Sequence, residues 1–161
     1  MPSRMPHVHH LGVCYSNGTG IEQNKVEAVK WFKKAAAQGH AKSQYNLGSI
    51  YLAGKGGVRK DEKEAIKYFR LAADQNLAEA QHNLGFCYLQ GIGVKKDEKE
   101  AVKWFRKAAE QGFAASQHNL GRCYAGGIGV KEDEKEAIKW FKKAAEQGHA
   151  DAKMALRILG Y

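Results

Sequence analysis

The chain has 161 residues and a formal net charge of +9 at neutral pH, because 26 Lys and Arg side chains outnumber 17 Asp and Glu. Lys is interleaved with Glu throughout, so we interpret most of this charge as a solvated surface, and nucleic acid is not the expected partner. No apolar run approaches the ~20 residues of a membrane span and residues 1–10 lack a signal-peptide pattern, so we expect a soluble chain and favour the cytoplasm.

The first repeat, residues 5–40, contains two short motifs that return along the chain. His10-Leu11-Gly12 is an imperfect copy of Asn-Leu-Gly, which follows at 46–48, 83–85 and 119–121, so that the leucines are 36, 37 and 36 residues apart. The second motif is Trp31-Phe32, which returns as Tyr68-Phe69, Trp104-Phe105 and Trp140-Phe141. A fixed period with two apolar motifs per copy predicts two helices per repeat, which we name helix A and helix B.

The second repeat, residues 41–77, explains the one irregular spacing. Its loop, Gly54-Lys55-Gly56-Gly57-Val58, is one residue longer than Gly91-Ile92-Gly93-Val94 of the third repeat. The extra residue therefore lies in a loop and leaves the helices unchanged.

The third repeat, residues 78–113, illustrates the helical pattern. At about 100° per residue, one face of its helix A carries Ala78, Gln81, Leu84, Gly85 and Tyr88. This pattern predicts helix A over 78–90 and helix B over 98–111. Because each helix has one apolar face, neither is expected to be stable alone, and a stack of helix pairs is the predicted fold.

Capping residues mark the ends of helix B in every repeat. The expected N-terminal caps are Asn24, Asp61, Asp97 and Asp133, and a Glu follows each of them three residues later, as in an acidic capping box. The expected left-handed C-terminal caps are Gly39, Asn76, Gly112 and Gly148.

The fourth repeat, residues 114–149, is followed by a segment, 150–161, that breaks the pattern. Arg157 occupies the place of a glycine of helix A that, we infer, lets helix B approach closely. An Arg there fits a terminal helix, so residues 150–161 are predicted to be a cap. The predicted fold class is all-α: an α/α solenoid, or superhelix, of four helix pairs plus a C-terminal capping helix, in one domain over residues 1–161.

The fourth repeat also contains a more specific pattern. Its residues are Ala114, Leu120, Gly121, Tyr124, Gly127, Gly129, Val130, Asp133, Glu136, Ala137, Trp140, Ala144, Ala145 and Gly148. This pattern resembles the Sel1-like repeat, and the resemblance covers the chain from about Met5 to Leu156. A tetratricopeptide array is related but has a shorter period of about 34 residues and lacks the Gly-x-Gly-Val loop. The resemblance implies an α/α superhelix that serves as an adaptor in protein complexes.

No group of residues indicates catalysis, so an enzyme, a cofactor and a metal site are not expected. The Gly-x-Gly segments follow helices and lack Gly-Lys-Ser/Thr, and the serines have no nucleophile motif. The paired carboxylates recur as caps in the second, third and fourth repeats, whereas a catalytic pair is normally singular. His7, His9 and His10 lie near a chain end and are interpreted as at most an adventitious metal site.

The cysteines, Cys14, Cys87 and Cys123, take equivalent positions in helix A, where the second repeat has Ile50. Equivalent residues of stacked helices are ~8–10 Å apart, whereas a disulfide needs Cα atoms within about 7 Å. We therefore interpret the cysteines as small buried hydrophobic residues and expect no disulfide framework.

The candidate binding residues lie on helix A, opposite its buried face. An Asn recurs there, and an amide can donate to a peptide carbonyl and accept from a peptide N–H. Phe86 is a candidate for the aromatic anchor typical of binding hot spots. The predicted partner-binding set is Lys42, Asn46, Ser49, Glu79, Asn83, Phe86, Gln90, Asn119 and Arg122. The competing interpretation is that the Asn side chains serve the architecture of the repeat and that a neighbouring repeat covers Phe86.

Two functional hypotheses follow. The first is a monomeric protein-interaction scaffold that binds a peptide or partner protein in the concave helix A groove. The alternative is electrostatic binding of nucleic acid or an anionic membrane through the Lys-rich face of helix B, although Glu98, Glu100 and Glu110 dilute that charge. Such binding would weaken steeply with salt. The identity of the partner stays open at this point.

Overall fold

The computed structural model describes residues 5–161, and these form nine α-helices and no strand. The first four residues of the predicted domain lie outside this range. In chain order the helices are α1 (Met5–Asn17), α2 (Lys25–Ala37), α3 (Ala41–Ala53), α4 (Glu62–Asp74), α5 (Ala78–Gln90), α6 (Glu98–Glu110), α7 (Ala114–Gly126), α8 (Glu134–Glu146) and α9 (Ala150–Ile158). The all-α prediction is confirmed. Odd-numbered helices are A helices and even-numbered ones are B helices. Within the described range, none combines the length and apolarity that crossing a membrane requires.

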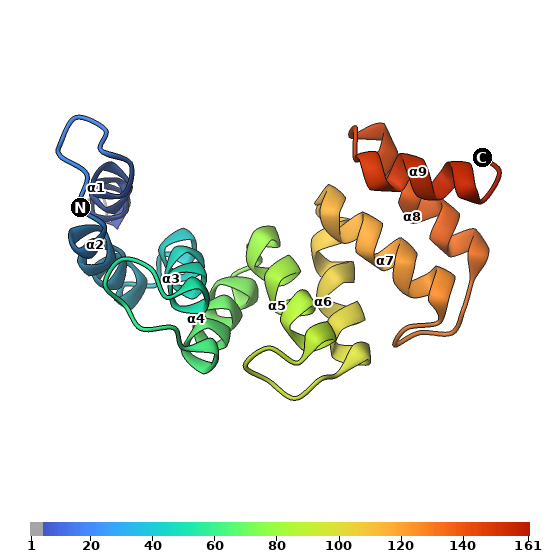
Figure 1. Cartoon of the computed structure of the whole chain (residues 1–161), viewed down its shortest axis with the longest axis horizontal. Coiled ribbons are helices and arrows are strands. Elements are labelled where there is room, and N and C mark those ends of the chain that lie inside the picture. Colours follow the sequence, from blue (N-terminus) through green and yellow to red (C-terminus); the bar gives the residue numbers. More distant parts are fainter. Residues whose placement is uncertain (1–4) are drawn as a thin grey trace. The chain divides into compact units, whose positions relative to one another are not determined.

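Two compact units divide the chain, Met1–Leu77 and Ala78–Tyr161, and we call them the N-terminal and the C-terminal unit. The N-terminal unit contains α1 to α4, and the C-terminal unit contains α5 to α9. Within each unit, every helix packs against the next one along the chain (Figure 1). This sequential packing is that of a helical solenoid, in which a repeat contacts its neighbours.

A glycine of helix A and a phenylalanine of helix B hold each helix pair together. A Cβ atom placed on Gly48 would lie 2.6 Å from Cδ1 of Phe69, whose side chain is fully buried. In the third repeat, a Cβ on Gly85 would lie 2.9 Å from Phe105. Because interiors are close-packed, a methyl group has no room at this contact, and the inferred role of the glycine is confirmed. In α9 the same position is Arg157, whose side chain is exposed.

The N-terminal caps of the B helices are partly those of a capping box. The carboxylate of Asp97 accepts a hydrogen bond from the backbone N–H of Glu100 at 3.0 Å, as predicted. The prediction of the reciprocal hydrogen bond, from the N–H of the N-cap residue to the glutamate side chain, is wrong. The N–H of Asp97 donates to the carbonyl of Tyr88 at 2.9 Å, so it is not available to a glutamate side chain. Glu100 instead forms an ion pair with Lys103, at 3.4 Å.

Left-handed residues follow the B helices, as predicted. The φ angle is 86° at Gly39 and 87° at Gly112 and Gly148. Asn76 takes the same place in the second repeat with φ of 66°, which Asn tolerates better than most residues. The predicted helix B over 98–111 is one residue too long, because Gln111 is the C-cap of α6.

Buried glutamines connect consecutive repeats. Gln117 on α7 is buried, and its Nε2 donates to the carbonyl of Ala109 in the last turn of α6, at 3.2 Å. Its Oε1 accepts from Nε2 of Gln147, the C-cap of α8, at 2.9 Å. One amide therefore joins two B helices through the A helix between them. The pairs Gln44–Gln75 and Gln81–Gln111 repeat the second contact, both at 2.7 Å.

The three cysteines are free thiols. Cys87 and Cys123 are buried, which confirms their interpretation as small hydrophobic residues, whereas Cys14 is half-buried. Burial raises the pKa of the Cys123 thiol to about 11. The two buried cysteines therefore belong to the core of their repeats.

Candidate functional site

Part of the predicted binding set lines a cleft in the N-terminal unit. This cleft has a volume of about 330 Å³ and lies between α1 and α3. Asn46 and Ser49, both half-buried, line it from α3. The other lining residues are Val13, Ser16, Asn17, Phe32 and Ile50. The cleft thus combines two amides and two hydroxyls with apolar walls, which is the composition of a surface that can hold a peptide.

The cleft arises from the two faces of helix A. Gly48 lies against Phe69 of the following B helix, Leu47 packs with residues of the preceding B helix, and Asn46 and Ser49 line the cleft toward the neighbouring A helix. Lys42 lies one turn before Asn46 and is exposed. Because Lys42 contributes to lowering the pKa of both His9 and His40, its positive charge lies close to this end of the A helices.

The rest of the predicted set lies in the C-terminal unit. Phe86 on α5 is 45% exposed, although the leucine two residues before it is fully buried. The competing interpretation, that a neighbouring repeat covers Phe86, is therefore only partly met, because almost half of this side chain stays exposed among the described residues. The remaining members are the half-buried Glu79, Asn83 and Asn119 and the exposed Gln90 and Arg122. The predicted site is thus divided between the two units, and its role in binding stays a prediction.

Histidines on the A helices form a contact that sequence reasoning missed. In α5, Nδ1 of His82 lies 2.8 Å from Oγ of Ser116 on α7, and its ring packs against Phe105 with centroids 5.7 Å apart. His9 and Ser43 make the same contact in the N-terminal unit, at 2.8 Å. The two residues are separated by almost one repeat, so their spacing alone did not suggest the pairing. Each contact joins consecutive A helices.

The surroundings of these histidines favour the neutral imidazole. Desolvation by burial is the largest cause that lowers the pKa of His9, His40, His82 and His118. His40 has an additional reason to be neutral at Nδ1, because that atom accepts a hydrogen bond from the backbone N–H of Ser43 at 3.2 Å as the cap of α3. These histidines therefore serve packing and capping.

No three His, Cys, Asp or Glu side chains gather as a metal site in the part of the chain that the structure describes. Within the predicted histidine cluster, His9 contacts Ser43, and its ring lies tilted against that of His40 with centroids 4.4 Å apart. His10 lies 3.5 Å from Sγ of Cys14. The cluster members thus point to different neighbours.

The Lys-rich face of helix B is a mixed surface. Lys103 pairs with Glu100 on the same helix, and the amine of Lys107 lies 4.6 Å from the ring centroid of Trp104. Lys30 and Lys67 make ion pairs with the preceding glutamates in their own helices. These contacts agree with the dilution of charge that the sequence indicated.

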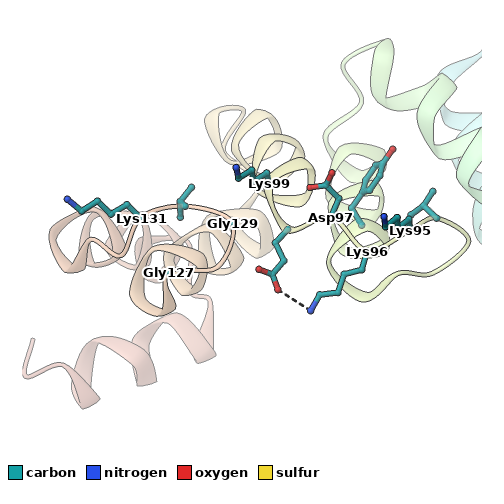
Figure 2. A pocket seen from close by; sticks show the side chains of 11 residues that line it. Lys95, Lys96, Asp97, Lys99, Gly127, Gly129 and Lys131 are labelled. Atoms are coloured by element: carbon teal, nitrogen blue, oxygen red, sulfur yellow. Dashed lines mark ion pairs between the residues drawn. The ribbon is translucent and has the colours of Figure 1, made fainter.

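A larger cleft lies in the C-terminal unit and was not predicted from the sequence. It has a volume of about 1180 Å³ and lies between the loop that precedes α6 and the loop that precedes α8 (Figure 2). Its charged lining residues are Lys95, Lys96, Asp97, Glu98, Lys99 and Lys131. The Gly-x-Gly segments form turns between helix A and helix B. The sequence signal for this cleft is the Lys that follows Gly-x-Gly-Val in both repeats, Lys95 and Lys131.

The comparisons with known proteins agree with this geometry. A family model described as Sel1 repeat matches residues 9–40, 41–77, 78–113 and 114–149. The crystal structure of a Sel1 repeat protein from Oxalobacter formigenes is similar, with a TM-score of 0.89 and 39% identity over 94% of this chain and 62% of that chain. The structure of a protective antigen of uropathogenic Escherichia coli with an SLR fold has a TM-score of 0.89 and 40% identity over 92% of this chain and 32% of that chain.

A curated relative matches over a shorter stretch. The DAP3-binding cell death enhancer 1 of Rattus norvegicus is 43% identical over 42 residues, which are 26% of this chain and 8% of that protein. The chain therefore spans less than two thirds of the length of each of these three proteins.

Proposed function

Because the chain belongs to the Sel1 repeat family, whose members generally mediate protein–protein interactions, we propose that it is a scaffold that binds a peptide or partner protein along its A helices. The family fold is typically non-enzymatic, and the proposed role requires no chemistry of the chain. The proposed contact surface is the predicted set on α3, α5 and α7, which we call the helix A surface. Each compact unit contributes its own part of this surface.

The exposure of Phe86 is the observation that carries the proposal. An aromatic side chain that is 45% exposed on a helix still has much apolar area to remove from water. Aromatic residues are enriched among the few that dominate the free energy of binding. Asn83 lies one turn before Phe86 on the same helix, where an amide could fix the register of a bound backbone.

The cleft between α1 and α3 supports the same role in the N-terminal unit. At about 330 Å³ it is large enough for one or two side chains of a ligand. Asn46 on its wall is equivalent to Asn83, so the same amide recurs beside an apolar contact in both units. A peptide segment suits such a surface, because its backbone can hydrogen-bond to the amide and its side chains can pack on the apolar patch.

The experiment compares two variants as baits for partner capture, followed by calorimetric titration of each captured protein. Phe86→Ala combined with Asn83→Ala removes the proposed anchor, and we expect it to weaken binding about 30-fold. The matched control is Leu71→Ala, because Leu71 is 44% exposed and lies on a B helix. Circular dichroism checks that both variants are folded.

The two possible outcomes separate clearly. A partner that loses affinity for the Phe86 variant and keeps it for the Leu71 variant supports the helix A surface. Equal affinity of every captured partner for the wild type and the Phe86 variant would show that binding uses another surface, and the proposal would then be wrong.

A further inference from the structure

The larger cleft of the C-terminal unit is built from two loops and one tyrosine. Tyr88, Val94 and Val130 supply its apolar lining. The loop before α8 is held against the first turn of α6 at Gly129, where a Cβ atom would overlap the carbonyl of Glu98. Gly129 also has a φ angle of 66°, a conformation that favours glycine. The two loops that line the cleft therefore have a defined spacing.

The charges of the cleft do not cancel. Glu98 forms an ion pair with Lys96 at 3.0 Å, and the carboxylate of Asp97 is engaged as the cap of α6. The remaining charged lining residues are Lys95, Lys99 and Lys131, and they make no ion pair with the residues that the structure describes. All three are exposed. Four lysines and two carboxylates give the lining a net charge of +2, and three of its amines have no ion-pair partner among the described residues.

The arrangement of the lysines indicates an extended ligand. Figure 2 shows that Lys95, Lys99 and Lys131 come from different places around the cleft and do not converge on one point. The volume of about 1180 Å³ is also above the usual range of a small-molecule pocket, about 300–1000 Å³. A single phosphate group could contact one of these amines at a time, whereas a chain with spaced carboxylates could reach several.

From these observations we propose that this cleft, which we call the lysine cleft, binds an extended Asp- and Glu-rich segment of a partner protein. Spaced side-chain carboxylates pair with the free amines, and the aliphatic parts of the ligand contact Val94 and Val130. The apolar side chains of Val94 and Val130 favour a peptide over a nucleic-acid backbone, because aliphatic carbons of a peptide can pack against them, and binding of RNA is one outcome of the test below. The lysine cleft is separate from the helix A surface, so this proposal does not depend on that one.

The test uses the full chain and a fluorescein-labelled acidic peptide of about eight residues, which is long enough to span several lysines when extended. Binding is followed by fluorescence anisotropy. The lysine-cleft variant combines Lys95→Gln, Lys99→Gln and Lys131→Gln. The matched control combines Lys55→Gln, Lys63→Gln and Lys135→Gln, which are exposed, do not line this cleft and change the net charge by the same amount.

We expect the lysine-cleft variant to lower the affinity about tenfold and the control to change it less than about twofold, because loss of three local charge pairs exceeds a general change in net charge. A weaker interaction at higher salt and loss of binding when Gln and Asn replace the peptide carboxylates complete the expected result.

Three outcomes would overturn the proposal. The first is equal loss of affinity in the two variants, which would mean attraction by net charge alone. The second is absence of measurable binding of the acidic peptide even at low salt. The third is displacement of the peptide by a single-stranded RNA of the same length at lower concentration, which would identify a nucleic-acid surface.

Discussion

Nδ1 of His118 is buried and has no hydrogen-bond partner among the described residues, and Ala152 occupies the position that supplies a serine partner in two other repeats. His82 contacts the hydroxyl of Ser116 at 2.8 Å, and Ala152 is the residue one repeat after that serine. Ala152 is fully buried. A donor or acceptor is therefore missing from one of the repeated contacts between A helices.

Replacing Ala152 with Ser is expected to stabilise the C-terminal unit. The new hydroxyl would supply a partner for His118, and an intramolecular hydrogen bond contributes about 1 kcal/mol to stability. Ser116 is fully buried in the equivalent position, so a serine fits there. Urea unfolding followed by circular dichroism measures the gain. The control is the same substitution in a His118→Phe background, where the gain should disappear, and a gain that persists would contradict the hypothesis.

Removing a hydroxyl should have the opposite effect. Ser116→Ala leaves Nδ1 of His82 without its partner, so the free energy of unfolding should fall by about 1–3 kcal/mol. The measurement is thermal unfolding, and the control is Ser49→Ala, which removes a serine that lines the small cleft. The comparison separates loss of the His82 contact from a general effect of removing a serine. Equal melting temperatures of the two variants would contradict the assigned role.

The stability of the folded chain should decrease as the pH falls below about 6.5, which is the ordinary pKa of a histidine side chain. Burial lowers the pKa of His82 in the folded chain, so below that pH the unfolded chain binds more protons than the folded one. The free energy of unfolding then falls with falling pH until the folded-state pKa is reached. The same direction holds for His9, His40 and His118.

The groups that face these histidines preserve this direction. Positive Lys42 and Arg122 also lower the pKa values of the histidines beside them, and Asp151 is the opposing charge near His118. The measurement is the urea midpoint at pH 7.5 and at pH 5.5. A His82→Phe variant should lose less stability between the two conditions, and an equal or larger loss would count against the assignment.

Adding one methyl group at Gly48 should destabilise the N-terminal unit. The new Cβ would lie 2.6 Å from the buried ring of Phe69, and overpacking of this kind costs about 1–3 kcal/mol. This outweighs the gain in helix propensity of about 1 kcal/mol from Gly→Ala. Urea unfolding of Gly48→Ala, of Phe69→Leu and of the double variant measures the coupling. The double variant should be more stable than the sum of the single effects implies, and simple additivity would refute the contact.

The three thiols should differ in reactivity in the folded chain. Burial raises the pKa of Cys123 to about 11 and hides its sulfur, so few thiolates are available near pH 8. Iodoacetamide should therefore label the half-buried Cys14 first, as read by peptide mass spectrometry. Denaturant should allow all three to react. Labelling of Cys123 as fast as that of Cys14 in the folded chain would contradict its burial.

Features set by neighbouring residues in the chain were predictable. The helix ends follow from Asp97 as an N-cap and from left-handed Gly112 after the C-cap, because these hydrogen bonds span a few residues only. The close approach of helix B at the glycine of helix A was also inferred from the repeated pattern, whereas its contact with Phe69 came from the structure. The alternation of A and B helices and the length of the repeat were predictable for the same reason.

Contacts between distant residues were not predictable in the same way. The partner of Glu100 was misassigned, because the carbonyl of Tyr88 occupies the N–H of Asp97 and this depends on how the loop folds back. The serine partner of His82 lies almost a repeat away, on another helix. Neither pairing has a local signal in the sequence.

The repeat by itself determined the class of fold, the boundaries of the predicted helices to within one residue, and the membership in an interaction family, because local propensity and apolar periodicity act along the chain. The tertiary structure decided which side chains share a surface. It leaves Phe86 exposed on α5, and it brings the lysines of two loops, about one repeat apart in sequence, around one cleft. The physical reason is that burial and charge compensation depend on all neighbours in space, and the sequence specifies only the neighbours along the chain.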